Sequence, residues 1–531
     1  MLVDIKGAKC VGIDAVPVTV EVNIDRGIGI HLVGLADAAV KESLLRTITA
    51  LQSMGFHIPG KKIVINLAPA DMHKNGSGYD LPIALGIIAA SEQRSLPGLG
   101  RYIIMGELGL DASVRDVPGA LLFAELAEKL GFEGCILPKR SALEALEFTE
   151  SRVYGVDTLD EVLRILEERE NNEDLLIRNR ADVLESVEKA KGQAPGYMDF
   201  AEIIGQEGAK RGAEIAVAGS HNLILIGAPG SGKSSMAKAM AGILPPMTKE
   251  ESLVTSKLYS VVGKRENPFG LMRQRPFRAP HYSASLPALI GGGGGDSLVP
   301  GEVSLAHNGV LFLDELAQMP KSVIEALRGP IEDRCVEVSR LRAKLVYPAS
   351  FMLVAATNPC PCGYYGEGDR CTCSIGQVRG YLSRLSGPIM DRIDIHLWVH
   401  PVDTGRLVAR TKGESSAAIA ARVLAAREIQ KERFAGEGIF TNAEMNNRQL
   451  EKFCPLTSEC NQLLQKLIDR LGLSARAFSR IIKLSRTIAD LEAAAESVVT
   501  GAPPVPGPIL PRHISEASAY RFLDKRNILD L

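Results

Sequence analysis

The sequence has no long uninterrupted hydrophobic run, although 46% of its 531 residues are hydrophobic. A helix that crosses a membrane needs about 20 mostly apolar residues, so we expect no membrane span and no membrane partner. The first residues, MLVDIKGAKCVGID, carry charged side chains where a secretory signal would have its apolar core. These absences predict a cytoplasmic protein.

The chain also lacks an excess of charge of one sign. Its 61 Lys and Arg residues are balanced by 63 Asp and Glu residues, which gives a formal charge of -2. Net charge therefore predicts no general attraction to nucleic acid, and any such binding has to come from local basic patches. Nine cysteines in so long a chain are too few for a disulfide scaffold.

The length predicts three or four domains of roughly 150 residues each. Residues 1–165 alternate β-rich and helical runs, which indicates an α/β domain, whereas residues 166–198 are dense in charge and favour a linker. In residues 199–400, short apolar runs alternate with helical stretches, as in a doubly wound nucleotide-binding core. Residues 401–531 carry long amphipathic patterns and are predicted to be helical.

The segment NLILIGAPGSGKSSMAKAM contains the pattern G-x-x-x-x-G-K-S between a predicted strand and a predicted helix. In such a loop the backbone amides surround the phosphates, the lysine reaches the β- and γ-phosphates, and the final serine can bind Mg²⁺. A glycine-rich turn that matches by accident is the alternative, and the flanking strand and helix argue against it. The predicted ATP-binding residues are Gly227, Ala228, Pro229, Gly230, Ser231, Gly232, Lys233 and Ser234.

Two further apolar runs end in polar side chains. GVLFLDE ends in Asp314 and Glu315, and FMLVAATN ends in Asn358. Carboxylates are costly to bury without a role, so we expect Asp314 to hold Mg²⁺ together with Ser234, and Glu315 to polarise the attacking water. Asn358 is expected to orient that water or to sense the γ-phosphate. Each residue taken singly could instead be a polar cap at a strand end.

Taken together, GAPGSGKS, VLFLDE and ATNPCPCG resemble the magnesium-chelatase-like AAA+ ATPases. The blocks RPFRAPHYSASLPALIGGGG, YLSRLSGPIMDRIDIH and SARAFSRIIKLSRTIADL are similar to those of the YifB/ComM family, and with VGLADAAVKESLLR the resemblance covers nearly the whole chain. It implies an α/β AAA+ P-loop core with a helical C-terminal lid. It also implies a homo-oligomeric ring, a hexamer, with ATP at the subunit interfaces.

The same resemblance assigns roles to three arginines. Arg392, in PIMDRID, corresponds to the arginine finger that reaches the γ-phosphate of a neighbouring subunit, and Arg384 is a second candidate. Arg476, in SARAF, corresponds to the sensor-2 arginine. A guanidinium stabilises the charge on transferring phosphoryl oxygens. The alternative for each is an ordinary surface or helix-pairing arginine.

Two basic stretches are candidates for contact with DNA. VEV and KLVYP flank a basic tip and predict a β-hairpin, which in related ring motors lies in the central channel; a solvated turn is the alternative. Residues 257–278 also carry an excess of cations with aromatic residues between them, which suits single-stranded DNA or a subunit interface. The hairpin residues expected to contact the DNA backbone are Arg340, Arg342 and Lys344.

Four of the cysteines form the pattern C-x-C-x₈-C-x-C directly after Asn358. Four thiolates can complete a tetrahedral zinc site, although the spacing within each pair is tighter than the usual C-x₂₋₄-C. A structural zinc here would stiffen the strand that ends in Asn358, and four unligated thiols are the alternative. The predicted ligands are Cys360, Cys362, Cys371 and Cys373.

Residues 1–165 resemble the Lon-protease-like domain, which has the ribosomal S5 domain 2-like fold. An active site of this type needs a serine and a lysine. This chain has Gly78, beside Ser77, at the serine position, and Leu121 and Phe123 in the stretch that would carry the lysine. Without a lysine base a serine is not activated, so we expect a ring-forming or DNA-guiding scaffold without proteolytic activity.

These observations predict an ATP-driven ring motor. The resemblance to competence-associated members implies action on single-stranded or branched DNA, as a helicase or branch-migration factor in recombination or natural transformation. A motor that remodels a protein client and a motor that assists metal chelation are the alternatives. The D-x-S-x-S motif of a chelatase partner is absent from the chain, and a basic pore tip favours DNA over protein.

Overall fold

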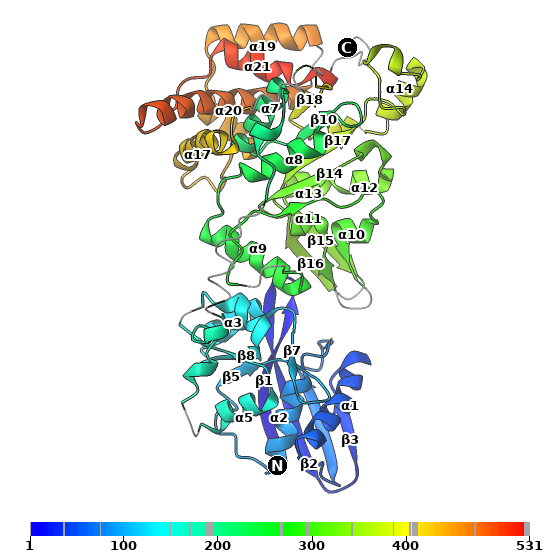
Figure 1. The fold of residues 1–531 in the computed structure, drawn as a ribbon, viewed down its shortest axis with the longest axis vertical. Helices are drawn as coiled ribbons and strands as arrows, with labels where there is room; N and C mark the ends of the chain where they lie inside the picture. The colour runs from blue at the N-terminus through cyan, green and yellow to red at the C-terminus, as the bar shows by residue number, and fades with distance from the viewer. Residues whose placement is uncertain are drawn as a thin grey trace.

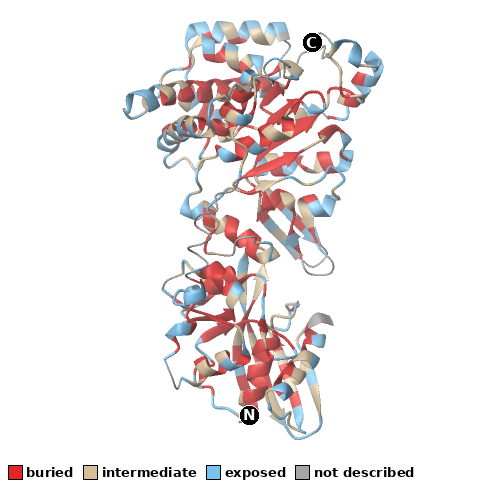
Figure 2. Ribbon diagram, in the orientation of Figure 1, coloured by how far each residue is buried: buried red, intermediate tan, exposed pale blue. Residues whose placement is uncertain are grey.

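The computed structural model describes residues 2–35, 38–74, 76–148, 150–168, 171–183, 185, 196–265, 269–293, 298–340, 343–385, 387–402, 405, 413–471 and 474–524. The molecule is elongated, with the N-terminal sheet at one end and the C-terminal helices at the other (Figure 1). The sheet nearer the C-terminal helices is largely buried, whereas much of the N-terminal sheet is only partly buried (Figure 2). No helix in the described part of the chain is long and apolar enough to cross a membrane.

The N-terminal part is built on a seven-stranded mixed sheet. Its strand order is β3 (Gly29–Val33), β4 (Lys62–Ala68), β2 (Asp14–Asp25), β1 (Leu2–Val11), β5 (Tyr102–Ile104), β8 (Gly134–Pro138) and β9 (Arg152–Val156). Strands β1, β2 and β4 pair antiparallel, whereas β5, β8 and β9 pair parallel. The accompanying helices are α1 (Ala38–Ser53), α2 (Asp80–Ala90), α3 (Ala120–Leu130), α4 (Lys139–Ala142) and α5 (Leu159–Glu167).

Helix α2 packs closely on this sheet because it carries a glycine where it crosses the strands. A Cβ on Gly86 would lie 2.9 Å from Cδ1 of Ile5, so no larger residue fits without movement. The segment after α5 differs from the expected solvated linker. Leu175, Leu176 and Ile177 are buried in the same hydrophobic core, because apolar side chains within this charged stretch cover the end of the sheet.

The second sheet has five strands, and all of their pairings are parallel. On β10, Leu223 and Leu225 point into one hydrophobic core and Ile224 and Ile226 into another, as expected for a sheet covered on both faces. The order is β11 (Phe277–Arg278), β14 (Val310–Leu313), β17 (Met352–Thr357), β10 (Leu223–Ile226) and β18 (Ile395–Trp398). Helices α7 (Glu207–Gly219) and α8 (Lys233–Gly242) flank β10 in the chain.

Helices form the C-terminal part of the described chain. Their bounds are α17 (Ser416–Arg433), α18 (Asn447–Phe453), α19 (Ser458–Leu471), α20 (Ala475–Thr500) and α21 (Pro511–Ala519). Both α17 and α20 contact α7, so the helical part rests on one face of the parallel sheet. Helix α20 ends at Gly501, whose φ of 69° terminates it before the proline-rich segment.

The two sheets are joined through α9 (Lys249–Val262), which packs on α3 (Figure 1). The buried Glu144 accepts a hydrogen bond from the hydroxyl of Ser260, and the same hydroxyl accepts the amide hydrogen of Leu121 at 3.3 Å. The expected hairpin is present beside this contact. It consists of β15 (Cys335–Arg340) and β16 (Ala343–Pro348) in antiparallel pairing.

Candidate nucleotide site

The glycine-rich loop connects the carboxyl end of β10 to the first turn of α8. Gly230 and Gly232 have φ values of 77° and 94°, a conformation that favours glycine. This backbone lets Lys233 begin the helix and return its ammonium group to the loop, where Nζ donates to the carbonyl oxygens of Gly227 at 2.7 Å and Ala228 at 2.9 Å. The loop is therefore folded around the lysine amine.

Lys233 also joins the loop to the neighbouring strand. Its Nζ donates to Oδ1 of Asn358 at 3.2 Å, and Asn358 directly follows β17. Burial lowers the pKa of Lys233, and the nearby carboxylates of Asp314 and Glu315 act in the opposite direction. A buried ammonium group with two acidic neighbours matches what a triphosphate requires, a focused positive charge beside metal-binding oxygens.

The hydroxyl of Ser234 donates a 2.9 Å hydrogen bond to Oδ2 of Asp314. The other carboxylate oxygen of Asp314 accepts the amide hydrogen of Glu315 at 2.9 Å, so this side chain is oriented from both sides. Glu315 itself has a φ of 52°, which is uncommon for a non-glycine residue and occurs often at functional sites. These oxygen atoms are of the kind that Mg²⁺ prefers.

The order of the strands explains why these groups meet. Strand β17 lies between β10 and β14, and the three run parallel. Their carboxyl ends therefore lie at one edge of the sheet, the usual place for ligands in open α/β sheets. Lys233, Asp314, Glu315 and Asn358, which follow these three strands, gather at that edge.

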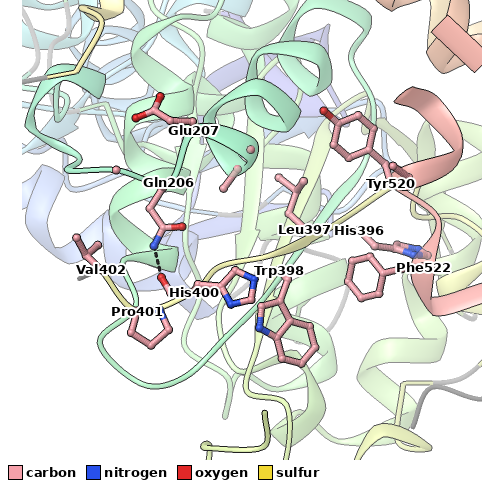
Figure 3. A pocket seen from close by; sticks show the side chains of 14 residues that line it. Gln206, Glu207, His396, Leu397, Trp398, His400, Pro401, Val402, Tyr520 and Phe522 are labelled. Atoms are coloured by element: carbon pink, nitrogen blue, oxygen red, sulfur yellow. Dashed lines mark hydrogen bonds between the residues drawn. The ribbon is translucent and has the colours of Figure 1, made fainter. Parts of the chain in front are cut away.

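A side pocket of about 650 Å³ opens beside the loop (Figure 3). Gln206 lies at its inner wall, where Nε2 donates to the carbonyl oxygen of Ser231 at 3.4 Å and to that of His400. Trp398 and Phe522 line it as well, with ring centroids 6.2 Å apart. The sequence prediction missed this pocket, and its one available signal was the strand-like segment IDIHLWVH, which contains the single tryptophan.

Two of the three predicted arginines, Arg392 and Arg476, lie apart from this cluster. Arg392 precedes β18, which pairs with β10 so that Ile395 faces Leu223 and Trp398 faces Ile226. Arg392 is therefore at the amino edge of the sheet, whereas the glycine-rich loop is at the carboxyl edge. Arg476 lies near Arg392, with its Nη1 3.8 Å from a carboxylate oxygen of Asp391.

Arg384 is exposed and follows α14 (Ile375–Leu382). Arg392, in contrast, has only 4% of its surface exposed. One of its guanidinium nitrogens lies 2.6 Å from a carboxylate oxygen of Glu332, and another donates to the carbonyl oxygen of Pro388 at 2.7 Å. In this single chain, Glu332 neutralises Arg392.

Arg392 lines a polar cavity of about 540 Å³ at the amino edge. The cavity is also lined by Arg427, Arg480 and Lys483, and the Nε atoms of Arg392, Arg427 and Arg480 are buried without a hydrogen-bond partner among the described residues. Burial lowers the pKa of Lys483 to about 8 and that of Arg427 to about 10. The cavity thus combines these cations with the carboxylates of Glu251, Glu332, Asp394 and Glu444.

The four predicted zinc ligands come together. Their sulfur atoms all lie within 4.8 Å of one another, and three of the distances are 3.3 Å for Cys360–Cys362, 3.9 Å for Cys360–Cys371 and 3.7 Å for Cys362–Cys371. Hydrogen bonds from the amides of Tyr364 and Thr372 lower the pKa of Cys362 to about 6. These four thiols can hold a metal ion.

The predicted DNA-contacting residues are described only in part. Lys344 is 63% exposed and its Nζ lies 3.0 Å from a carboxylate oxygen of Glu337 on the opposite strand of the hairpin. The backbone of Arg340 ends β15, and Arg342 lies outside the described residues. Midway along its length the hairpin approaches the N-terminal sheet, since a Cβ on Gly12 would lie 3.8 Å from Cδ2 of Leu345.

The second basic stretch serves contacts within the chain. Lys257 lies 2.7 Å from a carboxylate oxygen of Glu125, and Arg273 lies 3.0 Å from one of Glu147, both in the N-terminal part. Arg275 and Arg278 pair with Glu251 and Glu302, respectively. These four cations pair with neighbouring carboxylates, whereas Lys264 is exposed and Arg273 is still 82% exposed.

The degenerate protease positions have apolar surroundings. A Cβ on Gly78 would lie 3.0 Å from Cε of Met105 and 3.3 Å from Cγ1 of Val117. Leu121 is fully buried and packs with Leu122 and Leu271 in the contact with α9. The described structure therefore places no basic side chain at the position of the missing lysine.

Three family profiles match the chain. The profile described as subunit ChlI of Mg-chelatase matches residues 20–141, and magnesium chelatase, subunit ChlI, matches residues 199–407. The profile of the C-terminal part of subunit ChlI of magnesium chelatase matches residues 413–501. All three regions of the fold are thus related to parts of this chelatase subunit.

Relatives match over almost the full length. The uncharacterized protein YifB of Salmonella typhimurium is 41% identical, with 97% of this chain and 96% of YifB covered. Competence protein ComM of Haemophilus influenzae is 42% identical, with 96% of each chain covered. The archaeal Lon protease of Methanocaldococcus jannaschii is 25% identical over 155 residues, which are 29% of this chain and 24% of that protease. The chain therefore belongs to the YifB/ComM family of magnesium-chelatase-like AAA+ proteins.

Proposed function

We propose that this protein is an ATP-hydrolysing ring motor that moves on single-stranded or branched DNA. Membership of the AAA+ family implies the use of ATP and Mg²⁺. The observation that carries the proposal for this chain is the meeting of Lys233, Ser234, Asp314 and Asn358 at one edge of the sheet. These residues come from three parallel strands and provide a cation, metal-binding oxygens and an amide around one space.

The triphosphate of ATP occupies the glycine-rich loop, and its base enters the side pocket beside Trp398. Ser234 and Asp314 are the residues that would hold Mg²⁺, since their oxygens already face each other at 2.9 Å. The bound ion supplies charge neutralisation for the β- and γ-phosphates. Glu315 polarises the attacking water, and Asn358 orients it.

The proposal of a ring is supported by the separation of Arg392 from the nucleotide loop. A guanidinium at the amino edge cannot reach the phosphates at the carboxyl edge of the same sheet, so in the proposed ring Arg392 leaves Glu332 and serves the phosphates of a second copy. Arg392 is thus the finger, and Arg476 beside it the sensor-2 arginine. Arg384 is exposed and is the alternative finger.

The hairpin is the proposed DNA-contacting element. It stands beside the joint between the two sheets (Figure 1), and Lys344 near its tip is exposed. Arg340 and Arg342 add to the positive charge in the sequence of the tip. A basic tip contacts phosphates without reading bases. The relation to a competence protein of Haemophilus influenzae favours DNA in recombination or natural transformation as the client.

Zinc is the metal that we assign to the four cysteines. In a tetrahedral site with zinc–sulfur bonds of about 2.3 Å, neighbouring sulfurs are about 3.8 Å apart. The three sulfur distances of 3.3 to 3.9 Å agree with this value, whereas a disulfide would require about 2.05 Å. Four thiolates with two amide donors at Cys362 form a donor set suited to Zn²⁺.

The test is the ATPase rate of the purified protein with no DNA, with single-stranded DNA and with forked DNA. We expect DNA to stimulate hydrolysis, Lys233→Ala to abolish it, and the Arg340/Arg342/Lys344 alanine triple variant to retain basal hydrolysis without stimulation. The matched control removes three other exposed cations, Lys129, Lys431 and Arg512, and should respond like the wild type. Hydrolysis indifferent to every DNA would overturn the DNA assignment and favour a protein or metallation client.

A further inference from the structure

The segment between Asn358 and Ser374, here called the thiolate loop (residues 359–373), has no hydrophobic core of its own. Its single regular element is one 3₁₀ turn at Gly368–Arg370. Among its residues only Pro359, Cys360 and Gly363 are buried. Small segments that cannot bury a core need another cross-link. The four cysteines provide that cross-link when they bind a metal.

The loop rests directly on the nucleotide-binding loop. A Cβ on Gly363 would lie 2.7 Å from Cδ of Pro229, so the turn held by Cys360 and Cys362 packs on that proline without space for a side chain. The amide of Gly363 donates to the carbonyl oxygen of Cys360 at 3.0 Å, which fixes the turn. The position of Pro229 therefore depends on the position of the first cysteine pair.

The same loop reaches the side pocket. A Cβ on Gly366 would lie 3.5 Å from Cζ2 of Trp398, whose ring lines the pocket (Figure 3). Between these contacts, Arg370 stacks on the ring of Tyr364 with its Cζ 4.6 Å from the centroid. The thiolate loop thus touches both parts of the site, the phosphate loop through Gly363 and the pocket through Gly366.

We infer that the metal-bound thiolate loop forms a wall of the ATP site, so that occupancy of the four-cysteine site by zinc controls the affinity for ATP. This inference rests on the ATP and zinc sites proposed above. The metal takes no part in the phosphoryl transfer; it holds the wall against Pro229 and Trp398. Once it is removed, nothing cross-links the two cysteine pairs, and the wall loses its position.

The first measurement is the metal content of the full-length protein as purified, by elemental analysis. We expect one zinc per chain, and a Cys371→Ser/Cys373→Ser variant should contain none. Replacement by Co²⁺ should give the intense absorption of a tetrahedral cobalt–thiolate site. Cys335→Ser is the matched control, because it loses the same atom from a half-buried cysteine outside the loop, and it should retain the metal.

The second measurement uses Trp398, the single tryptophan of the chain. We expect ATP to change its fluorescence, which yields an affinity without any turnover. Removal of zinc with a chelator should weaken that affinity on the order of 10- to 100-fold, as when a positioning group shifts by about 1 Å, and added Zn²⁺ should restore it. Because the chelator and the added Zn²⁺ both act on the wild-type protein, a reversible change in ATP affinity cannot come from a variant that fails to fold.

The outcomes are distinct. Absence of ATP binding by the zinc-loaded wild type would overturn the proposed function itself. ATP binding that is equally tight with and without zinc, or a wild-type protein that contains no metal, would overturn this inference and leave the ATPase proposal intact. A large, reversible loss of ATP affinity on zinc removal, with Cys335→Ser unaffected, would support it.

Discussion

Ser234 and Asp314 are 80 positions apart in the chain, yet the hydroxyl of one donates a 2.9 Å hydrogen bond to the carboxylate of the other. They follow β10 and β14, which are not neighbours, since β17 lies between them. The contact therefore spans the width of three strands. It places both oxygens beside the loop that contains Lys233. The roles of the carboxylates near this loop can be tested one by one by substitution.

Glu315→Gln should separate ATP binding from hydrolysis. The amide has nearly the same shape as the carboxylate but cannot accept a proton, so we expect ATP affinity to persist and the rate of phosphate release to fall roughly 10²- to 10⁴-fold. Calorimetry and a phosphate-release assay measure the two quantities. Glu325→Gln, on a half-buried residue of α12 (Lys321–Ala326), is the control. An active Glu315→Gln enzyme would remove Glu315 from the mechanism.

Arg392→Ala should be inactive alone but should complement an inactive partner. Loss of a finger arginine lowers the rate of phosphoryl transfer by roughly 10³-fold or more. In a ring mixed from Arg392→Ala and Lys233→Ala chains, some interfaces join an intact Lys233 to an intact Arg392. We expect ATPase activity to reappear on mixing. If the mixture stays as inactive as its components, Arg392 does not act on a neighbouring subunit.

His307 should make the stability of the ATPase part depend on pH. Burial lowers its pKa to about 4, whereas an unfolded imidazole titrates near 6.5. Between these values the unfolded chain binds the proton and the folded chain does not. The contribution of His307 to the free energy of unfolding therefore has its full value above about pH 6.5. It falls by about 3 kcal/mol as the pH decreases toward 4.

His307→Asn keeps an acceptor for the amide of Ser350, which donates to Nδ1 of the histidine at 3.0 Å, but removes the titration. Denaturation by urea, followed by Trp398 fluorescence at pH 7.5, 6 and 5, should show a flatter pH dependence than in the wild type. The same change at the exposed His281 is the control. Identical pH profiles for His307→Asn and the wild type would contradict the assignment.

Ser260→Ala should loosen the contact between the two sheets. The hydroxyl serves the buried Glu144 and the amide of Leu121, and burial raises the pKa of Glu144. A buried polar group that loses its partner costs about 1–3 kcal/mol, so amides of α3 and α9 should exchange hydrogen faster. Ser515→Ala removes the same atoms from an exposed serine on α21. Unchanged exchange in α9 would show that this bond does not support the contact.

Most of the nucleotide loop was predictable because its residues are consecutive. The conformation from Gly227 to Ser234 depends on local backbone freedom and on the adjacent strand and helix. Asp314 and Asn358 were recognisable because polar residues directly follow buried strands. The hairpin was predictable for the same local reason, since two short β-rich runs flank a basic turn, and the structure has the expected pairing.

Other features could not be predicted, because they depend on side chains that meet from distant segments. The cations of residues 257–278 suggested an exposed patch, but Glu125 and Glu147 of the N-terminal part neutralise two of them. The segment after α5 contained charges typical of a linker, yet Leu175 and Ile177 are buried. Composition averages over a segment, whereas burial is decided residue by residue.

The sequence alone determined the chemistry available to this protein: a glycine-rich loop with Lys233, two carboxylates at the end of an apolar run, and two pairs of cysteines. Each of these is a local pattern, whose geometry follows from neighbouring residues. Only the tertiary structure decided that the cysteine turn rests on Pro229, that Trp398 lines the pocket beside it, and that Arg392 lies at the opposite edge from Lys233. Such relations come from strand order and the packing of distant segments, which no local pattern encodes.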